Sequence, residues 1–261
     1  MQVFGIKTPL IKKGDDLVSI ALSGAERIKN PIQSHDIVVY SAKVIGVSQG
    51  RLVDLSTIVP SEEGKALSRK YKLEPPFAEL VLREADAVLG GVDYAALTVK
   101  SGVLTANAGV DQSNAPLGHA ALWPKDPQKS ADDLRAGFRK AGLDVGVLVV
   151  DSRTLPLRMG STGVALGISG FSPVEDLRGR KDLFGRPMKI KRAALADDIA
   201  SASNIVMGET SESVPIAVVR GAPVRFEEGH NIEEAFIPMD QCLIMHLFEG
   251  CSDYELARKK C

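Results

Sequence analysis

The sequence has few of the features that build disulfide frameworks, membrane spans or nucleic-acid surfaces. Its three cysteines all lie after residue 240 and do not form a disulfide framework. No apolar run approaches the roughly 20 residues that a membrane-spanning helix needs, and the formal net charge of −1 argues against general nucleic-acid binding. Residues 1–16 place their lysines after the apolar residues and lack a long apolar core, unlike a signal peptide. We therefore expect a cytoplasmic protein in a reducing compartment, with no membrane and no nucleic acid among its partners.

The chain also lacks the usual nucleotide and zinc signatures. No P-loop and no G-x-G-x-x-G motif follows an expected strand, and the glycine-rich residues 160–170 match no standard phosphate motif, so close packing is the favoured interpretation. Cys242, His246, Cys251 and Cys261 are residue types that bind zinc, but their spacing is irregular and no C-x-x-C pair exists. We favour Cys242 and His246 as core residues of the apolar stretch CLIMHLF.

A chain of 261 residues is near the upper limit for one hydrophobic core, so its length allows one large domain or two closely joined ones. Apolar spacing and end signals predict helices over residues 15–28, 75–91, 130–142 and 193–209, with Ser130 as the N-cap of the third. Runs rich in Val and Ile predict buried strands over residues 145–153 and 214–221 and an extended segment over residues 36–55. Residues 96–109 predict a hairpin that turns at residues 100–102. The fold class is therefore mixed, α/β or α+β.

Acids and hydroxyls gather at the ends of these elements in three short stretches. They are ANAGVDQSN with Asp111 and Asn114, VVDS with Asp151 and Ser152, and MGETSESV, which begins at residue 207. Carboxylates and hydroxyls are the hard oxygen ligands that Mg²⁺ and Mn²⁺ take, together with phosphate oxygens. Each acid taken alone is more often a solvated turn residue, so the stretches point to a metal-bound nucleotide only if the fold brings them together.

In their order along the chain, several stretches resemble the coenzyme F420-0:L-glutamate ligases, also called γ-glutamyl ligases. The stretches are PLIK, ANAGVDQSN, LWPKDPQKSA, VVDS, GISGFSPVEDLRGRKDLFGRPM, ADDIASASNIVMGE and VPIAVVRG. The resemblance runs from about residue 5 to about residue 225 and leaves residues 226–261 as a C-terminal extension. It implies a single α+β domain of mixed sheets with packed helices, arranged as an intertwined homodimer. It also implies GTP, Mn²⁺ or Mg²⁺, and the attachment of L-glutamate to the deazaflavin F420-0 by way of an acyl phosphate.

The resemblance assigns roles to residues one by one. Asp111 and Asp151 match the acids that hold one metal and serve catalysis, while Ser152 and Glu209 match the positions of a second metal. Ser152 stands where the family usually has Thr, which keeps the hydroxyl. The residues that match the nucleotide site are Pro9, Leu10, Ile11, Lys12, Ala42, Lys43, Asn114, Met207, Gly208, Glu209, Thr210, Ser211, Glu212, Ser213 and Val214.

Two stretches depart from the family pattern. GVSQGR stands where SKAEGR is usual, so Val47 replaces a lysine that contacts phosphate, and DSRTLPLR stands where DTxGR is usual. A lost charged contact of this kind is worth roughly 1.5–3 kcal/mol. Lys43 lies four residues upstream in the expected extended segment, too far along a strand to take the place of the missing lysine. Arg153 is therefore expected to point towards the phosphates, and pairing with a surface acid is the alternative. The departures leave open a paralogous ligase with another acceptor, or a non-catalytic nucleotide or deazaflavin binder.

Overall fold

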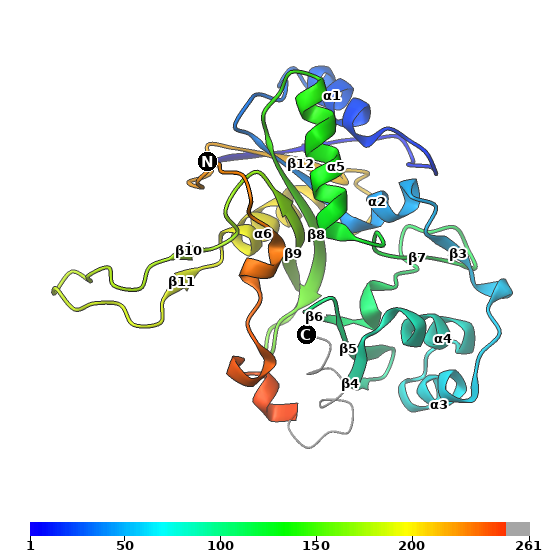
Figure 1. Cartoon of the computed structure of the whole chain (residues 1–261). Helices are drawn as coiled ribbons and strands as arrows, with labels where there is room; N and C mark the ends of the chain where they lie inside the picture. The colour runs from blue at the N-terminus through cyan, green and yellow to red at the C-terminus, as the bar shows by residue number, and fades with distance from the viewer. Residues whose placement is uncertain (249–261) are drawn as a thin grey trace.

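A central five-stranded sheet organises the protein, and a computed structural model describes it over residues 1–248 (Figure 1). Its strand order is β1-β12-β2-β8-β9, and the one parallel pairing within this sheet joins β2 to β8. The bounds are Gln2–Ile6 for β1, Ile216–Arg220 for β12, Ile37–Ser41 for β2, Gly146–Thr154 for β8 and Ser161–Ser169 for β9. The three inner strands are buried over most of their length, which explains their continuous runs of Val and Ile.

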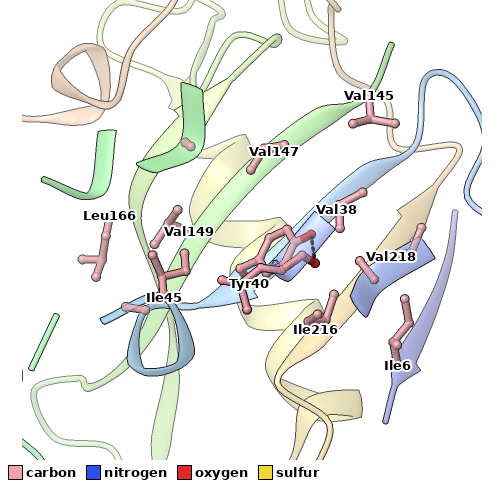
Figure 2. Packing of buried hydrophobic residues seen from close by; sticks show 14 of the residues in the cluster. Ile6, Val38, Tyr40, Ile45, Val145, Val147, Val149, Leu166, Ile216 and Val218 are labelled. Carbon is pink, nitrogen blue, oxygen red and sulfur yellow. Dashed lines mark hydrogen bonds between the residues drawn. The ribbon is translucent and has the colours of Figure 1, made fainter. Parts of the chain in front are cut away.

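Helices cover both faces of this sheet. On one face, α1 (Leu17–Arg27) and α5 (Pro127–Lys140) pack on alternate strand residues such as Val38, Tyr40 and Val218 (Figure 2). On the other face, α6 (Leu195–Met207) packs on the intervening residues, which include Val39 and Leu148. Because successive side chains of a strand point to opposite faces, both sets of alternate residues have to be apolar here.

A smaller set of elements lies beyond one end of the central sheet (Figure 1). Helix α2 (Ala42–Ser48) leads from β2 into it. A pair of strands, a pair of helices and a three-stranded antiparallel sheet follow, and much of their apolar surface forms a separate core. Their bounds are Leu52–Asp54 (β3), Glu62–Tyr71 (α3), Pro75–Glu84 (α4), Ala87–Val92 (β4), Ala95–Lys100 (β5), Val103–Ala106 (β6), Asn107–Gly109 (η2) and His119–Ala121 (β7).

Two further segments complete the described chain. Strands β10 (Glu175–Asp176) and β11 (Arg192–Ala193) pair at the base of a long arm that projects away from the body (Figure 1). Near its tip, Leu183 is 100% and Phe184 85% exposed. The short helices η3 (Ile232–Ala235), η4 (Met239–Gln241) and η5 (Met245–Phe248) follow β12, and the last two pack on β4 and β5.

The mixed α+β architecture and most of the expected elements are confirmed. The hairpin of residues 96–109, the strands β8 and β12, and the helices α1 and α6 lie where the sequence predicted them. No helix in residues 1–248 is long and apolar enough to cross a membrane.

Four local predictions were wrong. The segment 36–55 is not extended throughout, because α2 interrupts it, and the helix expected to reach residue 91 ends at Glu84, followed by β4. Asp126, not Ser130, caps α5: its carboxylate accepts from the Lys129 amide at 2.8 Å, and Ser130 lies inside the helix. His246 is exposed rather than part of the core. Cys251 and Cys261 lie outside the described residues.

Candidate functional site

A cavity of about 660 Å³ collects the three acid-bearing stretches that are distant in the sequence. Its walls come from residues 8–13, α2, residues 111–116, the end of β8 and residues 204–215. A volume of this size is within the range of small-molecule and cofactor sites. All the site residues predicted from the sequence line it except Ala42, whose side chain is fully buried in the core beneath α2. Ala42 therefore offers no side chain to a ligand.

Asp111 is fixed at the cavity by backbone pairing and by three donors. Its amide donates to the carbonyl of Ala121 at 3.0 Å, and its carbonyl accepts from the Ala121 amide at 2.8 Å. The Lys43 ammonium donates to Oδ2 at 2.6 Å, and the amide and hydroxyl of Ser113 donate to the carboxylate at 2.7 Å each. Burial alone raises the pKa of Asp111, but Lys43 and Ser113 outweigh it and hold that pKa below its usual value. The carboxylate is therefore ionised and oriented before any ligand arrives.

Asp151 is held differently. It follows the buried run of β8, and its Oδ2 accepts a hydrogen bond of 2.5 Å from the indole Nε1 of Trp123. It forms no ion pair with any residue in the described part of the chain. Burial raises the pKa of Asp151 to about 6, against the lowering effect of the Trp123 hydrogen bond. A half-buried carboxylate without an ion-pair partner in the described chain suits a bound metal ion, whose charge favours its ionised form.

The loop after α6 forms the opposite wall. The Glu209 carboxylate accepts hydrogen bonds of 2.7 Å from the Ser161 hydroxyl and from the side-chain amide of Asn204. The side-chain amide of Asn114 donates to the carbonyl of Thr210 at 2.7 Å, which ties this loop to the segment that carries Asp111. Within residues 1–248, no three His, Cys, Asp or Glu side chains are grouped as a metal cage. The oxygen ligands present suit metal ions that are each held by two protein groups, with phosphate oxygens completing the coordination. Mg²⁺ is usually bound with nucleotides in this way.

Cations line the cavity as well. Lys12 and Lys13 both lie on its wall, are exposed, and form no ion pair within residues 1–248, whereas Lys43 is already paired with Asp111. Arg153 does not line the cavity. Its guanidinium pairs with Asp197 of α6 at 3.1 Å, so the prediction that it points towards the phosphates is wrong and the pairing alternative holds.

Several residues of this site were not predicted from the sequence. Ser113 lies within a stretch singled out for its acids, but its part in holding Asp111 depends on the loop conformation. Asn204 and Lys13 also line the cavity: Asn204 lies within the stretch ADDIASASNIVMGE but was given no role, and Lys13 directly follows PLIK. Trp123 is separated from Asp151 by 28 positions, and no spacing signal links them.

The fold and cavity define a mixed α+β protein with a cavity lined by carboxylates and lysines. The family model F420-0:Gamma-glutamyl ligase matches residues 5–221. A protein of Methanococcus maripaludis (strain C7) is 38% identical over 231 residues, which cover 88% of this chain and 91% of the relative. A protein of Methanopyrus kandleri is 38% identical over 83% of this chain and 85% of its own length. Both relatives are named coenzyme F420:L-glutamate ligase, and the chain belongs to the F420-0:γ-glutamyl ligase family.

A third relative bears on the C-terminal segment. The coenzyme F420:L-glutamate ligase of Archaeoglobus fulgidus is 34% identical over 253 residues, which cover 96% of this chain and 99% of the relative. An alignment of that extent continues past residue 225, into the C-terminal segment 226–261 that lies beyond the family motifs.

Proposed function

We propose that this protein is a GTP-dependent, divalent-metal-dependent ligase that attaches L-glutamate to the deazaflavin coenzyme F420-0 by γ-glutamyl amide bonds. The observation that carries the proposal is the meeting of Asp111, Asp151, Ser152 and Glu209 in one cavity with the loop of residues 207–214. Oxygen ligands, free lysines and a backbone loop together suit a metal-bound triphosphate. Membership of the family and the names of the relatives support glutamate and F420-0 as the substrates.

In the proposed reaction, a carboxylate oxygen of the acceptor attacks the γ-phosphorus of GTP, and GDP leaves. The glutamate amine then attacks the carbonyl carbon of the acyl phosphate, which forms the amide, expels phosphate and releases a proton. Metal ions would be held by Asp111 and Asp151, and by Ser152 and Glu209, where they would offset charge on the transferred phosphoryl group.

The chain's own groups position the reactants. Lys43 keeps Asp111 ionised and oriented, because its ammonium lies 2.6 Å from that carboxylate. Lys12 and Lys13, free of protein acids in the described chain, offset the charge of the triphosphate at the cavity wall. Asn114 holds two walls of the cavity together through Thr210, so nucleotide binding between them needs little rearrangement.

The direct test is to incubate the protein with GTP, Mn²⁺, L-glutamate and F420-0 and to weigh the products. We expect an F420-0 adduct heavier by glutamate, formed together with GDP and lost when any one component is omitted. Asp111→Ala is expected to keep its far-UV circular dichroism and lose the product. Failure of the wild type to form either an adduct or GDP would contradict the proposal.

A second candidate is a related amide ligase with a different acceptor. Val47 favours it, because this apolar side chain lines the cavity where the family usually has a phosphate-binding lysine. In that case the same assay would show GDP release with glutamate and another acceptor, but no F420-0 adduct. A non-catalytic binder would bind nucleotide and release no GDP.

The assembly is also part of the proposal. We infer a single-domain cytoplasmic chain that forms an intertwined homodimer, as the family resemblance implies. The projecting arm supports it, because fully exposed apolar side chains at its tip are costly unless another surface covers them.

A further inference from the structure

Trp123 contacts both Asp151 and the backbone that leads to Asp111. Its side chain is 2% exposed, and its Nε1–H donates to Asp151 at 2.5 Å. Gly109, two residues before Asp111, packs against the same part of the ring: a Cβ at position 109 would lie 2.2 Å from the same indole nitrogen. The indole therefore contacts both the backbone that leads to one carboxylate and an oxygen of the other.

The backbone before Asp111 is shaped to accept this ring. Asn107, Ala108 and Gly109 all have left-handed backbone angles, with φ of 51°, 52° and 67°. The conformation is held by the hairpin below, because the Ala108 amide donates to the Thr98 hydroxyl at 2.8 Å and the Asn107 side chain accepts from the Ala96 amide at 2.8 Å. Non-glycine residues adopt such angles only where their surroundings compensate for the strain.

Charged groups that are buried or half-buried hold the Trp123 backbone and contact its ring. The Arg51 guanidinium donates to the Trp123 carbonyl at 2.6 Å and also bonds Glu84 at 2.8 Å. The Lys100 ammonium lies 5.2 Å from the indole ring centre and 2.6 Å from Glu84. A cation near an aromatic ring and a strong donor on its backbone leave the indole little freedom to move.

From these contacts we infer that Trp123 is a positioning residue, which sets the distance and orientation of Asp151 relative to Asp111. The inference rests on the proposed function, because the two carboxylates have to share a metal ion for their separation to matter. Trp123 touches neither substrate nor metal in this role. It acts through Asp151, to which it gives a neutral hydrogen bond that leaves the carboxylate's charge for the ion.

The variant that isolates the indole N–H is Trp123→Phe, which keeps an aromatic ring over Lys100. We expect it to weaken Mn²⁺ binding, measured by electron paramagnetic resonance of the free ion, at least tenfold. The matched control is Tyr40→Phe, which removes another buried ring donor, the hydroxyl that bonds the Leu17 carbonyl at 3.2 Å in the core. That control is expected to bind Mn²⁺ within about twofold of the wild type.

A second pair of variants tests the packing of the ring. Gly109→Ala places a methyl group against the indole and is expected to weaken Mn²⁺ binding as Trp123→Phe does. Gly118→Ala imposes the same left-handed strain, with φ of 75°, but has open space around its new methyl group. Similar Mn²⁺ affinities in the two glycine variants would overturn the role of the ring.

The protein contains a single tryptophan, so its indole N–H gives one resonance that needs no assignment. We expect that resonance to move on titration with Mg²⁺ and in Asp151→Asn, even if Trp123→Phe fails to fold. An unmoved resonance, or equal Mn²⁺ affinity in a folded Trp123→Phe variant and the wild type, would overturn the inference and leave the proposed function standing. Absence of Mn²⁺ binding in the wild type, with and without GTP, would overturn both.

Discussion

Lys43 and Val47 lie one turn apart on α2, and both side chains line the cavity. Residues four apart on a helix share a face, so a cation at either position reaches the same region. Lys43 is committed to Asp111, with its ammonium 2.6 Å from the carboxylate. Position 47 is therefore the place on this face where an added charge would meet a phosphate without first breaking a protein ion pair.

Val47→Lys is accordingly expected to tighten GTP binding by about tenfold, the effect of one additional charged contact of about 1.4 kcal/mol. Isothermal titration with GTP in the presence of Mn²⁺ measures the change. Val59→Lys adds the same charge at a position that is 80% exposed and outside the cavity, and it should leave the affinity unchanged. An affinity for Val47→Lys no better than that of this control would contradict the prediction.

Substitutions of Arg153 and Lys43 should differ in their effects on GTP binding. Arg153→Ala is expected to leave GTP affinity within about twofold, because its guanidinium is engaged by Asp197 outside the cavity wall, and to lower the free energy of unfolding by about 1 kcal/mol. Lys43→Ala is expected to weaken GTP and Mn²⁺ binding by tenfold or more. Parallel titrations and chemical denaturation decide it: a large loss of GTP affinity in Arg153→Ala would return that residue to the site.

Asp151 should make the metal-free protein less stable as the pH rises. Its pKa is raised to about 6 in the folded protein, above the usual value of 3.8, so the folded state holds its proton more tightly than the unfolded state. The contribution of Asp151 to stability is therefore greatest below about pH 4. It falls as the pH rises to about 6, by on the order of 2–3 kcal/mol at most.

Asp151→Asn removes this penalty. At pH 8, without metal, we expect the variant to have a larger free energy of unfolding than the wild type, and the difference to shrink towards pH 4. Urea denaturation across this range measures it. Equal stabilities of the two proteins at pH 8 would show that the carboxylate is not destabilised by burial. The same variant should fail to turn over GTP, because it lacks a charged metal ligand.

The arm should control assembly. A double substitution, Leu183→Asp with Phe184→Asp, is expected to convert the proposed homodimer to a 27.9 kDa species in multi-angle light scattering. The reason is that these exposed apolar side chains would otherwise be covered by a partner. Val59→Asp is the control for added surface charge. A wild-type protein that is already a single 27.9 kDa species at micromolar concentration would contradict the proposed dimer itself.

Local sequence signals were sufficient where one pattern dominated. The unbroken apolar runs of β8 and β12, the small-residue helix α6 and the hairpin that turns at Ser101 and Gly102 all follow from periodicity and turn residues. The acids Asp111 and Asp151 were found for the same reason, because each directly follows or ends an expected strand. The prediction that these acids meet in one site came from the family resemblance and not from their spacing.

Other features depended on contacts between distant segments. The residues of α2 are rich in Val and Ile, which favour strands, yet Ala42, Ile45 and Gly46 are buried at helical spacing. A Cβ at Gly46 would lie 2.0 Å from the Leu122 carbonyl oxygen, so this helix packs its backbone directly against the segment after β7. Tertiary packing overrode the local preference, and it moved Lys43 onto the same face as Val47.

The sequence by itself therefore determined β8, β12, the hairpin, four of the helices and the identity of the acids, because those depend on residues near one another in the chain. Only the tertiary structure decided their partners: Lys43 for Asp111, 68 positions away, Trp123 for Asp151, and Asp197 for Arg153. A hydrogen bond or ion pair of this kind needs two segments to meet at about 3 Å. No local pattern predicts which segments meet, because the sheet and helices between them determine their positions.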